Sequence, residues 1–217
     1  MLIMYKPKTP RCETDVIEVD DELLIDIIKS SDNGEKDKSL DRLKKNGTFY
    51  LKGVIKPSTL EELYFDLLEA IANDDIEEIT IYIHSEGGYT FDYLPLVDLI
   101  RCSPKKVITI GMGQVMSGAV LILISGHDRR AHQHCTYMIH DVHMSAGYQS
   151  HKEAMGTVRL HDHLMGLHDK LIMDMTSIST EEDLKQAFNA GIDNYFDSQK
   201  ALEYGLIDEV ILPRNKE

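Results

Sequence analysis

The chain has 217 residues, of which 42% are hydrophobic, and it carries a formal net charge of −14. This length suits one domain with a sizeable core, and no apolar run approaches the roughly 20 residues that cross a bilayer. The acidic balance argues against a nucleic-acid partner, because phosphate binding needs a basic surface. The N-terminus lacks the order of a signal peptide and the three cysteines are widely spaced, so we predict a reducing, cytoplasmic location.

The first 46 residues are the least globular part of the sequence. We predict that they form an acidic N-terminal extension or arm before a domain over residues 47–217. Residues 13–26 mix acidic and apolar side chains, and residues 30–38 have the polar composition of a solvated loop. Two interpretations stay open: the segment packs on another surface, or it is solvated decoration.

A β-α-β unit is predicted at the start of the domain. Residues 48–51 have the composition of a strand, and Pro57 opens a helix whose capping box pairs Ser58 with Glu61. The β-rich run over residues 79–84 predicts the second strand.

Glycines and a second helix follow that strand. Gly87 and Gly88 come directly after it, and the helix reaches about Ile100. Pro95 is tolerable in this helix only if it lies in the first turn, because proline lacks the N–H that an inner turn needs. Residues 106–110 predict a third strand, which ends in a turn of small residues.

The longest predicted helix covers residues 150–176. At 1.5 Å per residue it would be about 40 Å long, which is more than one domain of this size needs for cover. Part of its apolar stripe is therefore expected to be exposed in a monomer. Apolar residues recur along it at spacings of four, three, four and four: Leu160, Leu164, Leu167, Leu171 and Met175.

The remaining segments complete an alternation of strands and helices. Ser179 with Glu182 is predicted to cap a helix that stops at Gly191, and a short helix and a strand over residues 206–212 follow. This alternation predicts an α/β fold with a mainly parallel sheet and helical cover.

Ser117 opens an apolar helix directly after the third strand. In the first turn of a helix the backbone N–H groups lack intrahelical partners and the dipole is positive, so such a site can hold a developing oxyanion. The alternative interpretation is tight packing, in which Gly113, Gly118 and Ala119 are small because the helix lies close to the sheet.

Three strand ends bring the parts of a nucleophilic site together. Gly88, Ser117 and His140 each follow a predicted strand, and functional groups gather at such ends in α/β sheets. Serine needs a base that takes its proton, and histidine is suited to that near neutral pH. Asp193, in a loop, is the candidate carboxylate that would orient the base. Each residue alone also has an ordinary structural explanation.

Four stretches make the sequence resemble the Clp protease proteolytic subunit, a self-compartmentalising serine peptidase. The similarity runs from about Thr48 to Leu212. It implies the ClpP/crotonase fold, a ββα spiral with a mainly parallel sheet and a long handle helix. The stretches are Ile-Tyr-Ile-His-Ser-Glu-Gly-Gly at residues 81–88, Gly-Gln-Val-Met-Ser at 113–117, Tyr-Met-Ile-His at 137–140, and the closing segments at 193–195 and 201–208.

The resemblance assigns a role to each candidate. Ser117 matches the family nucleophile, His140 its general base and Asp193 its orienting acid. Gly88 and Gly118 match the positions whose N–H groups form the oxyanion hole. The chain order of serine, histidine and aspartate is no objection, because a triad is defined by geometry. The resemblance implies no cofactor and no metal.

The sequence also departs from the family pattern. Glu86 stands where the family has proline, and Gly118 stands where the bacterial enzymes commonly have methionine, which keeps the N–H donor and changes the pocket wall. The link from the Ser117 helix to His140 looks about two residues shorter than usual. The first 46 residues do not resemble the short axial loops of the family, which puts docking of an ATPase in doubt. A divergent or virus-encoded member would fit.

Other histidines offer alternative interpretations. His132 and His134 alternate on a predicted strand, and His161 and His168 share a helix face. Nothing in these spacings demands a metal, which needs close convergence of ligands. His143, three residues after the predicted base, is its rival.

The predicted function is a serine endopeptidase that works through an acyl-enzyme and degrades or processes unfolded polypeptides. The resemblance implies ATP-dependent proteolysis with an AAA+ unfoldase as partner. It also implies two stacked rings of seven subunits, with a strand near residues 147–149 pairing across the rings. Two other functions stay open: a catalytically idle ring-forming scaffold, and a crotonase-type acyl-CoA enzyme, which would share the oxyanion hole and usually relies on a carboxylate.

Overall fold

The computed structural model describes residues 33–144, 147–148 and 150–213. The chain divides into two compact units, residues 1–42 and 43–217, and the sheet belongs to the second. Within the described residues, no helix is both long and apolar enough to span a membrane.

Helix α2 (Asn33–Lys45) begins inside the segment that was expected to be a solvated loop, so that prediction is wrong for residues 33–38. Polarity misled here because glutamate, lysine and arginine are good helix formers. Residues 1–32 of the acidic arm predicted over residues 1–46 lie outside the described residues, and they include the acidic and apolar stretch at 13–26 and Cys12. The domain boundary after residue 46 stays a prediction.

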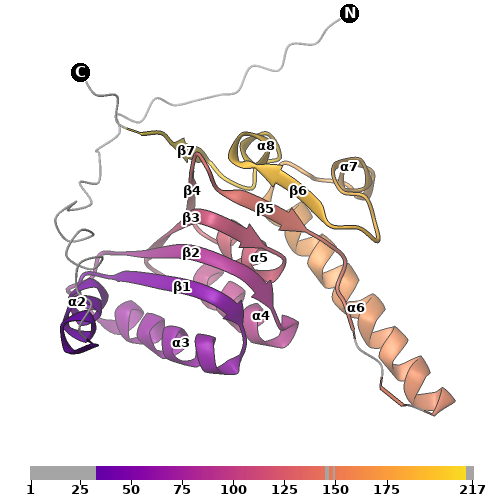
Figure 1. Cartoon of the computed structure of the whole chain (residues 1–217), viewed down its shortest axis with the longest axis horizontal. Coiled ribbons are helices and arrows are strands. Elements are labelled where there is room, and N and C mark those ends of the chain that lie inside the picture. Colours follow the sequence, from indigo (N-terminus) through magenta and orange to yellow (C-terminus); the bar gives the residue numbers. More distant parts are fainter. Residues whose placement is uncertain (1–32, 145–146, 149, 214–217) are drawn as a thin grey trace, which may run out of the picture. The chain divides into compact units, whose positions relative to one another are not determined.

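A seven-stranded, mostly parallel sheet organises the second unit (Figure 1). Five strands lie in the order β1-β2-β3-β4-β7, with every neighbouring pair parallel. The second half of β3 pairs in parallel with β5, and β6 pairs antiparallel to β5. This confirms the predicted fold class. The strands are β1 (Thr48–Ile55), β2 (Glu78–Gly88), β3 (Lys106–Met116), β4 (Asp128–His132), β5 (Thr136–Ile139), β6 (Asn194–Asp197) and β7 (Glu209–Ile211).

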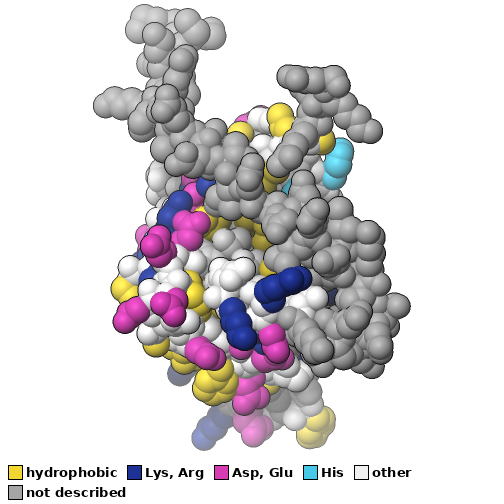
Figure 2. All heavy atoms as spheres, turned by 90° about the vertical axis from the view of Figure 1, so that its left-hand side faces the viewer, with side chains coloured by type: hydrophobic (Ala, Val, Ile, Leu, Met, Phe, Trp, Pro, Cys, Tyr) yellow, Lys and Arg dark blue, Asp and Glu magenta, His cyan; other side chains and the backbone are white. Residues whose placement is uncertain are grey.

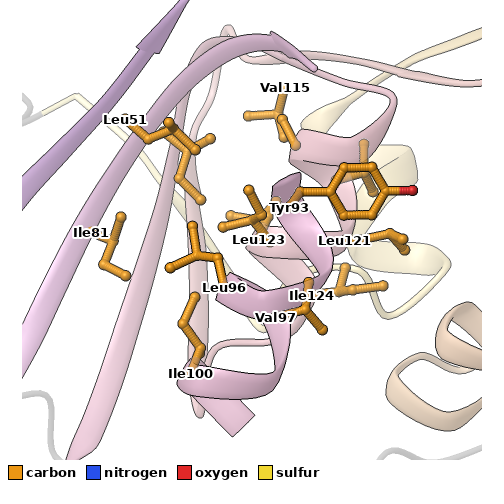
Figure 3. Close-up of a cluster of buried hydrophobic side chains, with 14 of the residues drawn as sticks. Leu51, Ile81, Tyr93, Leu96, Val97, Ile100, Val115, Leu121, Leu123 and Ile124 are labelled. Carbon is orange, nitrogen blue, oxygen red and sulfur yellow. The ribbon is translucent and has the colours of Figure 1, made fainter. Parts of the chain in front are cut away.

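Helix α5 is the centre of the core, because all seven of its residues are buried. It packs on β2, β3 and α4, and Figure 3 shows side chains of α4 and α5 meeting Leu51, Ile81 and Val115 from the strands. Burial of each such side chain stabilises the fold by about 2 kcal/mol. The further helices are α3 (Pro57–Ala72), α4 (Thr90–Arg101), α5 (Gly118–Ile124), α6 (His151–Met175), α7 (Glu181–Ala187) and α8 (Ser198–Glu203).

The start of α3 differs from the predicted capping box. The helix begins at Pro57, and the reciprocal bonds join Lys56 and Thr59 instead of Ser58 and Glu61. The Lys56 N–H donates to the Thr59 hydroxyl at 3.0 Å. Proline at the first helical position places the cap at Lys56, two residues before the predicted Ser58, because the missing N–H of proline needs no partner there.

Pro95 lies in the interior of helix α4. The prediction that this proline could lie only in the first turn is therefore wrong. The residue whose carbonyl loses its partner is Phe91, four residues earlier. Both side chains are on the exposed side of the helix, Phe91 with 64% of its surface accessible. Water can therefore satisfy that carbonyl, and the helix continues.

Two segments near the C-terminus were also predicted inaccurately. Helix α7 is capped by Thr180, whose hydroxyl accepts from Asp183 N, and it ends at Ala187 instead of Gly191. Residues 188–193 therefore form a loop into β6. In addition, β4 ends at His132, so His134 does not share a strand with it.

The apolar stripe of α6 packs largely on its own chain, so the expectation that a monomer exposes part of the stripe holds only for Leu160. Leu164 and Leu171 are only 4% and 6% exposed, and Leu160 is 36% exposed. The N-terminal half of α6 runs away from the sheet (Figure 1) and carries exposed Met155 and Val158.

Acidic and basic side chains are interspersed on the face that Figure 2 shows, over the described part of the α3 and β1 edge. On this face the charge is therefore mixed in sign.

Candidate active site

Ser117 lies between the end of β3 and the start of α5, as the N-cap residue of that helix. Its φ of 53° is positive, and it is the one non-glycine residue with positive φ in the described part of the chain. Such a conformation costs free energy and persists where surrounding contacts enforce it. Here the Ser117 N–H donates to the Met138 carbonyl at 2.7 Å, and buried α5 follows. The Ser117 turn is therefore held from both sides.

The glycine pair at the end of β2 lies directly against the nucleophile turn. A Cβ on Gly87 would stand 2.7 Å from Ser117 Cβ and 3.0 Å from Gly118 N, so only glycine fits. The Gly87 N–H already donates to the buried Ser85 hydroxyl at 3.0 Å, and that hydroxyl donates to the Gly53 carbonyl at 2.6 Å. The next N–H along, that of Gly88, is therefore the candidate donor toward Ser117.

Gly118 is glycine because another side chain fills its space. A Cβ at this position would overlap the ring of Tyr93, which comes from α4 and is 2% exposed. The departure from methionine at Gly118 thus has a structural partner in Tyr93, which sequence reasoning missed. No local signal pointed to it, because the two residues are on different helices.

His140 follows β5 immediately, and its Nε2 lies 2.8 Å from Ser117 Oγ. Burial lowers the pKa of His140 below its ordinary 6.5, and His143 lowers it further, whereas Asp193 and Asp141 raise it. The net lowering keeps the imidazole neutral at neutral pH. A neutral imidazole can accept the serine proton.

Asp193 lies near His140 without a hydrogen bond to it. Its Oδ1 is 3.9 Å from His140 Nδ1, and its side chain is 47% exposed. Among the residues that the structure describes, His140 Nδ1 has no hydrogen-bond partner although it is buried. The structure thus brings the serine and the histidine together and leaves the carboxylate more than one hydrogen-bond length away.

The rival base, His143, packs on His140 instead of on the serine. The two rings meet edge to face with centroids 4.4 Å apart. His168, buried on α6, also faces this site, and its pKa is lowered to about 4 by burial and then by His140. The sequence showed His168 on a helix face and gave no sign that α6 passes beside the base.

The other histidines do not converge. His161 Nε2 lies 2.8 Å from the Val142 carbonyl, and His132 is at the end of β4. Over the described ranges, no group of three or more histidine, cysteine, aspartate or glutamate side chains is placed to hold a metal ion.

The Clp protease family model matches residues 31–214. The chain belongs to the Clp protease family. Its match begins earlier than the Thr48 at which the motifs alone placed the start of the similarity. A Clp-type peptidase is the class of enzyme to which the family assigns the chain.

Curated relatives of this Clp protease family member match most of its length, and nearly the whole of their own. The ATP-dependent Clp protease proteolytic subunit of Streptococcus thermophilus is 27% identical over 188 residues, or 85% of this chain and 95% of the relative. Subunit 1 of Leifsonia xyli is 25% identical over 183 residues, 83% and 90% of the two chains. A solved structure of a ClpP1 point mutant from Listeria monocytogenes superposes with a TM-score of 0.69 at 23% identity, covering 80% of this chain and 96% of that one. This last likeness shows the fold.

Proposed function

We propose that this Clp protease family member is a serine endopeptidase with Ser117 as nucleophile and His140 as general base. The observation that carries the proposal is the 2.8 Å contact between Ser117 Oγ and His140 Nε2, at a residue held in a positive-φ turn. A nucleophile and base within hydrogen-bond reach are what acyl transfer requires. Family membership supports the same chemistry.

The reaction proceeds through an acyl-enzyme. Ser117 Oγ attacks the carbonyl carbon of the peptide bond while its proton passes to His140 Nε2. The tetrahedral adduct collapses as the C–N bond breaks, and His140 returns the proton to the leaving amine. Water then attacks the ester with His140 again as base, which releases the acid product and restores Ser117.

The N–H groups of Gly118 and Gly88 are the proposed oxyanion donors. Gly118 opens α5, so its N–H has no partner within the helix. Gly88 follows Gly87, which lies against Ser117, and its neighbour's N–H is already taken by Ser85. Both donors are backbone groups fixed by buried strands and helices. They are therefore positioned before the substrate arrives.

Assembly into two stacked rings of seven is proposed from the exposed half of α6. Met155 and Val158 are 46% and 53% exposed on a helix segment that leaves the sheet, and exposed apolar side chains on such a segment favour an interface. Members of the family typically form rings and work with Clp ATPases. We propose that the rings enclose a chamber to which an AAA+ unfoldase delivers unfolded polypeptides. We also propose that the protein is cytoplasmic.

A catalytically idle scaffold is the second candidate. The observation that favours it is the 3.9 Å gap between His140 Nδ1 and Asp193, which leaves the base without its orienting partner. The crotonase-type alternative has no use for the contact between Ser117 and His140, and it is the weaker explanation of this site.

Labelling with a fluorophosphonate probe distinguishes these candidates. An active nucleophile forms a covalent adduct, and we expect peptide mapping to find it on Ser117. The matched control is Ser58→Ala, which removes an exposed serine at the start of α3 and should leave labelling unchanged. Wild-type protein that takes up no probe would overturn the peptidase proposal in favour of the scaffold.

The assembly is tested separately by light scattering. We expect a mass of about fourteen chains, and Met155→Glu with Val158→Glu should reduce it. Lys152→Glu, an exposed change on the same half of α6, is the control. Leu164 and Leu171 are unsuitable for this test, because they are buried within one chain and their replacement would unfold it. A fully active species of 24.7 kDa would contradict the ring proposal.

A further inference from the structure

The loop that carries Asp193 is tied to the chain on both sides of the base. On one side the Asn194 amide donates to the Ile139 carbonyl at 3.2 Å. On the other side the Gly191 N–H donates to Asp141 Oδ2 at 2.8 Å. Ile139 and Asp141 are the immediate neighbours of His140 in sequence. The base and the acid loop are therefore joined at two points that bracket the imidazole.

These ties matter because no direct bond fixes the acid. His140 Nδ1 is buried and unpartnered within the described residues, and Asp193 is 3.9 Å from it. Apart from the Tyr195 hydroxyl, which donates to Asp193 Oδ2 at 3.3 Å, the position of the carboxylate follows from how the loop is held. Small displacements of the loop would change the distance from acid to base.

The two ties differ in how replaceable they are. Asn194 makes several bonds within its own loop, donating to the Asn189 and Ile192 carbonyls and accepting from Asn189 N, so it stabilises the loop itself. Among the residues that the structure describes, Asp141 makes one hydrogen bond, and that bond crosses from the base segment to the loop. Gly191 has a φ of 76°, a backbone conformation that glycine adopts without the strain of other residues, so the turn in which its N–H meets Asp141 suits a glycine.

We propose that Asp141 is a positioning residue, which holds the Asp193 loop beside His140 through the Gly191 N–H. This inference rests on the proposed function of Ser117, His140 and Asp193. Asp141 does not touch the nucleophile in this proposal: its Oδ2 is engaged by Gly191, and it acts through Asp193. Its charge also faces His140, together with His143, Asp193 and His168.

Two substitutions separate the hydrogen bond from the charge. Asp141→Asn keeps an acceptor oxygen for Gly191 N and removes the charge, whereas Asp141→Ala removes both. We expect Asp141→Ala to lower kcat on a fluorogenic peptide by about 10- to 100-fold with KM unchanged, since a misplacement of about 1 Å can cost that much. Asp141→Asn should recover most of the loss.

A double variant tests whether Asp141 acts through Asp193. In an Asp193→Asn background the orienting carboxylate is already gone, so adding Asp141→Ala should reduce kcat no further. The positioning role would be overturned if the two substitutions lowered kcat by the product of their separate effects. It would also be overturned if Asp141→Asn lowered kcat as much as Asp141→Ala. The control is Asp197→Ala, which removes a comparable carboxylate bond to Lys200 N, 2.9 Å long, at the start of α8.

An NMR titration of His140 tests the inference even if the protein does not cleave peptides. Losing the tie should let Asp193 move away, so Asp141→Ala should lower the pKa of His140 by more than Asp141→Asn does. Equal lowering in the two variants would leave only a charge effect and would overturn the inference. Failure of the proposed function shows itself differently, as wild-type protein that neither cleaves peptide nor takes up the fluorophosphonate probe.

Discussion

Two turns of the chain meet at the proposed active centre, and they are built in opposite ways. The Ser117 turn lies between a buried strand and a helix with no exposed residue, and its backbone is held at positive φ. The Asp193 loop lies on the surface, with its carboxylate 47% exposed and 3.9 Å from the base. The hydrophobic core positions the nucleophile, whereas a few polar bonds position the acid.

This difference has a physical origin. A close-packed core transmits any displacement to many neighbours, so the Ser117 turn cannot shift without cost. A surface loop held by single hydrogen bonds has alternatives that differ by about 1 kcal/mol for each bond. We therefore expect the nucleophile to be preformed in a single chain, while the acid depends on its ties and on assembly.

The largest expected effect comes from the preformed turn. Ser117→Ala removes the attacking oxygen and should lower kcat by about 10⁶-fold, as in the measured subtilisin case. The free energy of unfolding should not fall, because the positive-φ backbone is imposed by neighbours. Peptidase assays and urea unfolding measure the two quantities. An alanine variant that cleaves at the wild-type rate would end the peptidase proposal.

The exposed loop gives the second largest effect. Asp193→Asn should lower kcat by about 10⁴-fold if the loop closes on His140 during catalysis, the size measured for the equivalent chymotrypsin-type change. Tyr195→Phe, which removes only the hydroxyl bond to Asp193, is the milder comparison. A loss below tenfold for Asp193→Asn would mean that the gap persists and that Ser117 and His140 act as a pair.

Buried His168 should make the free energy of unfolding depend on pH. The pKa of His168 is lowered to about 4 by burial, so the fold favours its neutral form. Its contribution to stability is complete above about pH 6.5 and is lost as the pH falls toward 4. Between pH 7.5 and 5 the loss should be about 2 kcal/mol. Urea unfolding of His168→Leu should lack this loss, and exposed His163→Leu should retain it.

Packing against the nucleophile turn can be tested with two glycines. Gly118→Ala places a methyl group against the buried Tyr93 ring, and such overpacking costs about 1–3 kcal/mol. Gly166→Ala adds the same methyl group to α6, where nothing lies within 4 Å, and should stabilise by about 0.5–1 kcal/mol. Thermal unfolding measures both. If Gly118→Ala stabilised the protein as much as Gly166→Ala, the Tyr93 ring would have to move aside without cost, and the packing argument would be wrong.

The smallest effect concerns the pH profile of the base. Because burial and His143 lower the pKa of His140, activity should fall as the pH drops and be half lost below pH 6.5. His143→Asn should move that midpoint upward toward 6.5. The kcat/KM profile measures the shift. Complete loss of activity in this variant would instead make His143 the base.

The sequence by itself determined the fold class, where β1, β2 and β3 begin, and the three residues proposed for catalysis. The ends of the strands were predicted too early, because β2 runs to Gly88 and β3 to Met116, through the glycines that were expected to end them. Strand and helix periodicity is local, so it can be read along the chain. Ser117 and His140 each follow a strand, which predicted that the two residues meet. Ser117 Oγ and His140 Nε2 are 2.8 Å apart. Cap positions were less predictable, because Pro57 and Thr180 each moved a helix start by one or two residues.

Tertiary structure alone decided what surrounds those residues. Tyr93 beside Gly118, His168 near His140, and Asp141 bonded to Gly191 each join residues that are 25 or more positions apart in the sequence. It also decided that Leu164 and Leu171 are buried in one chain. Such contacts depend on how the elements pack, and packing is a property of the whole core, which no local pattern contains.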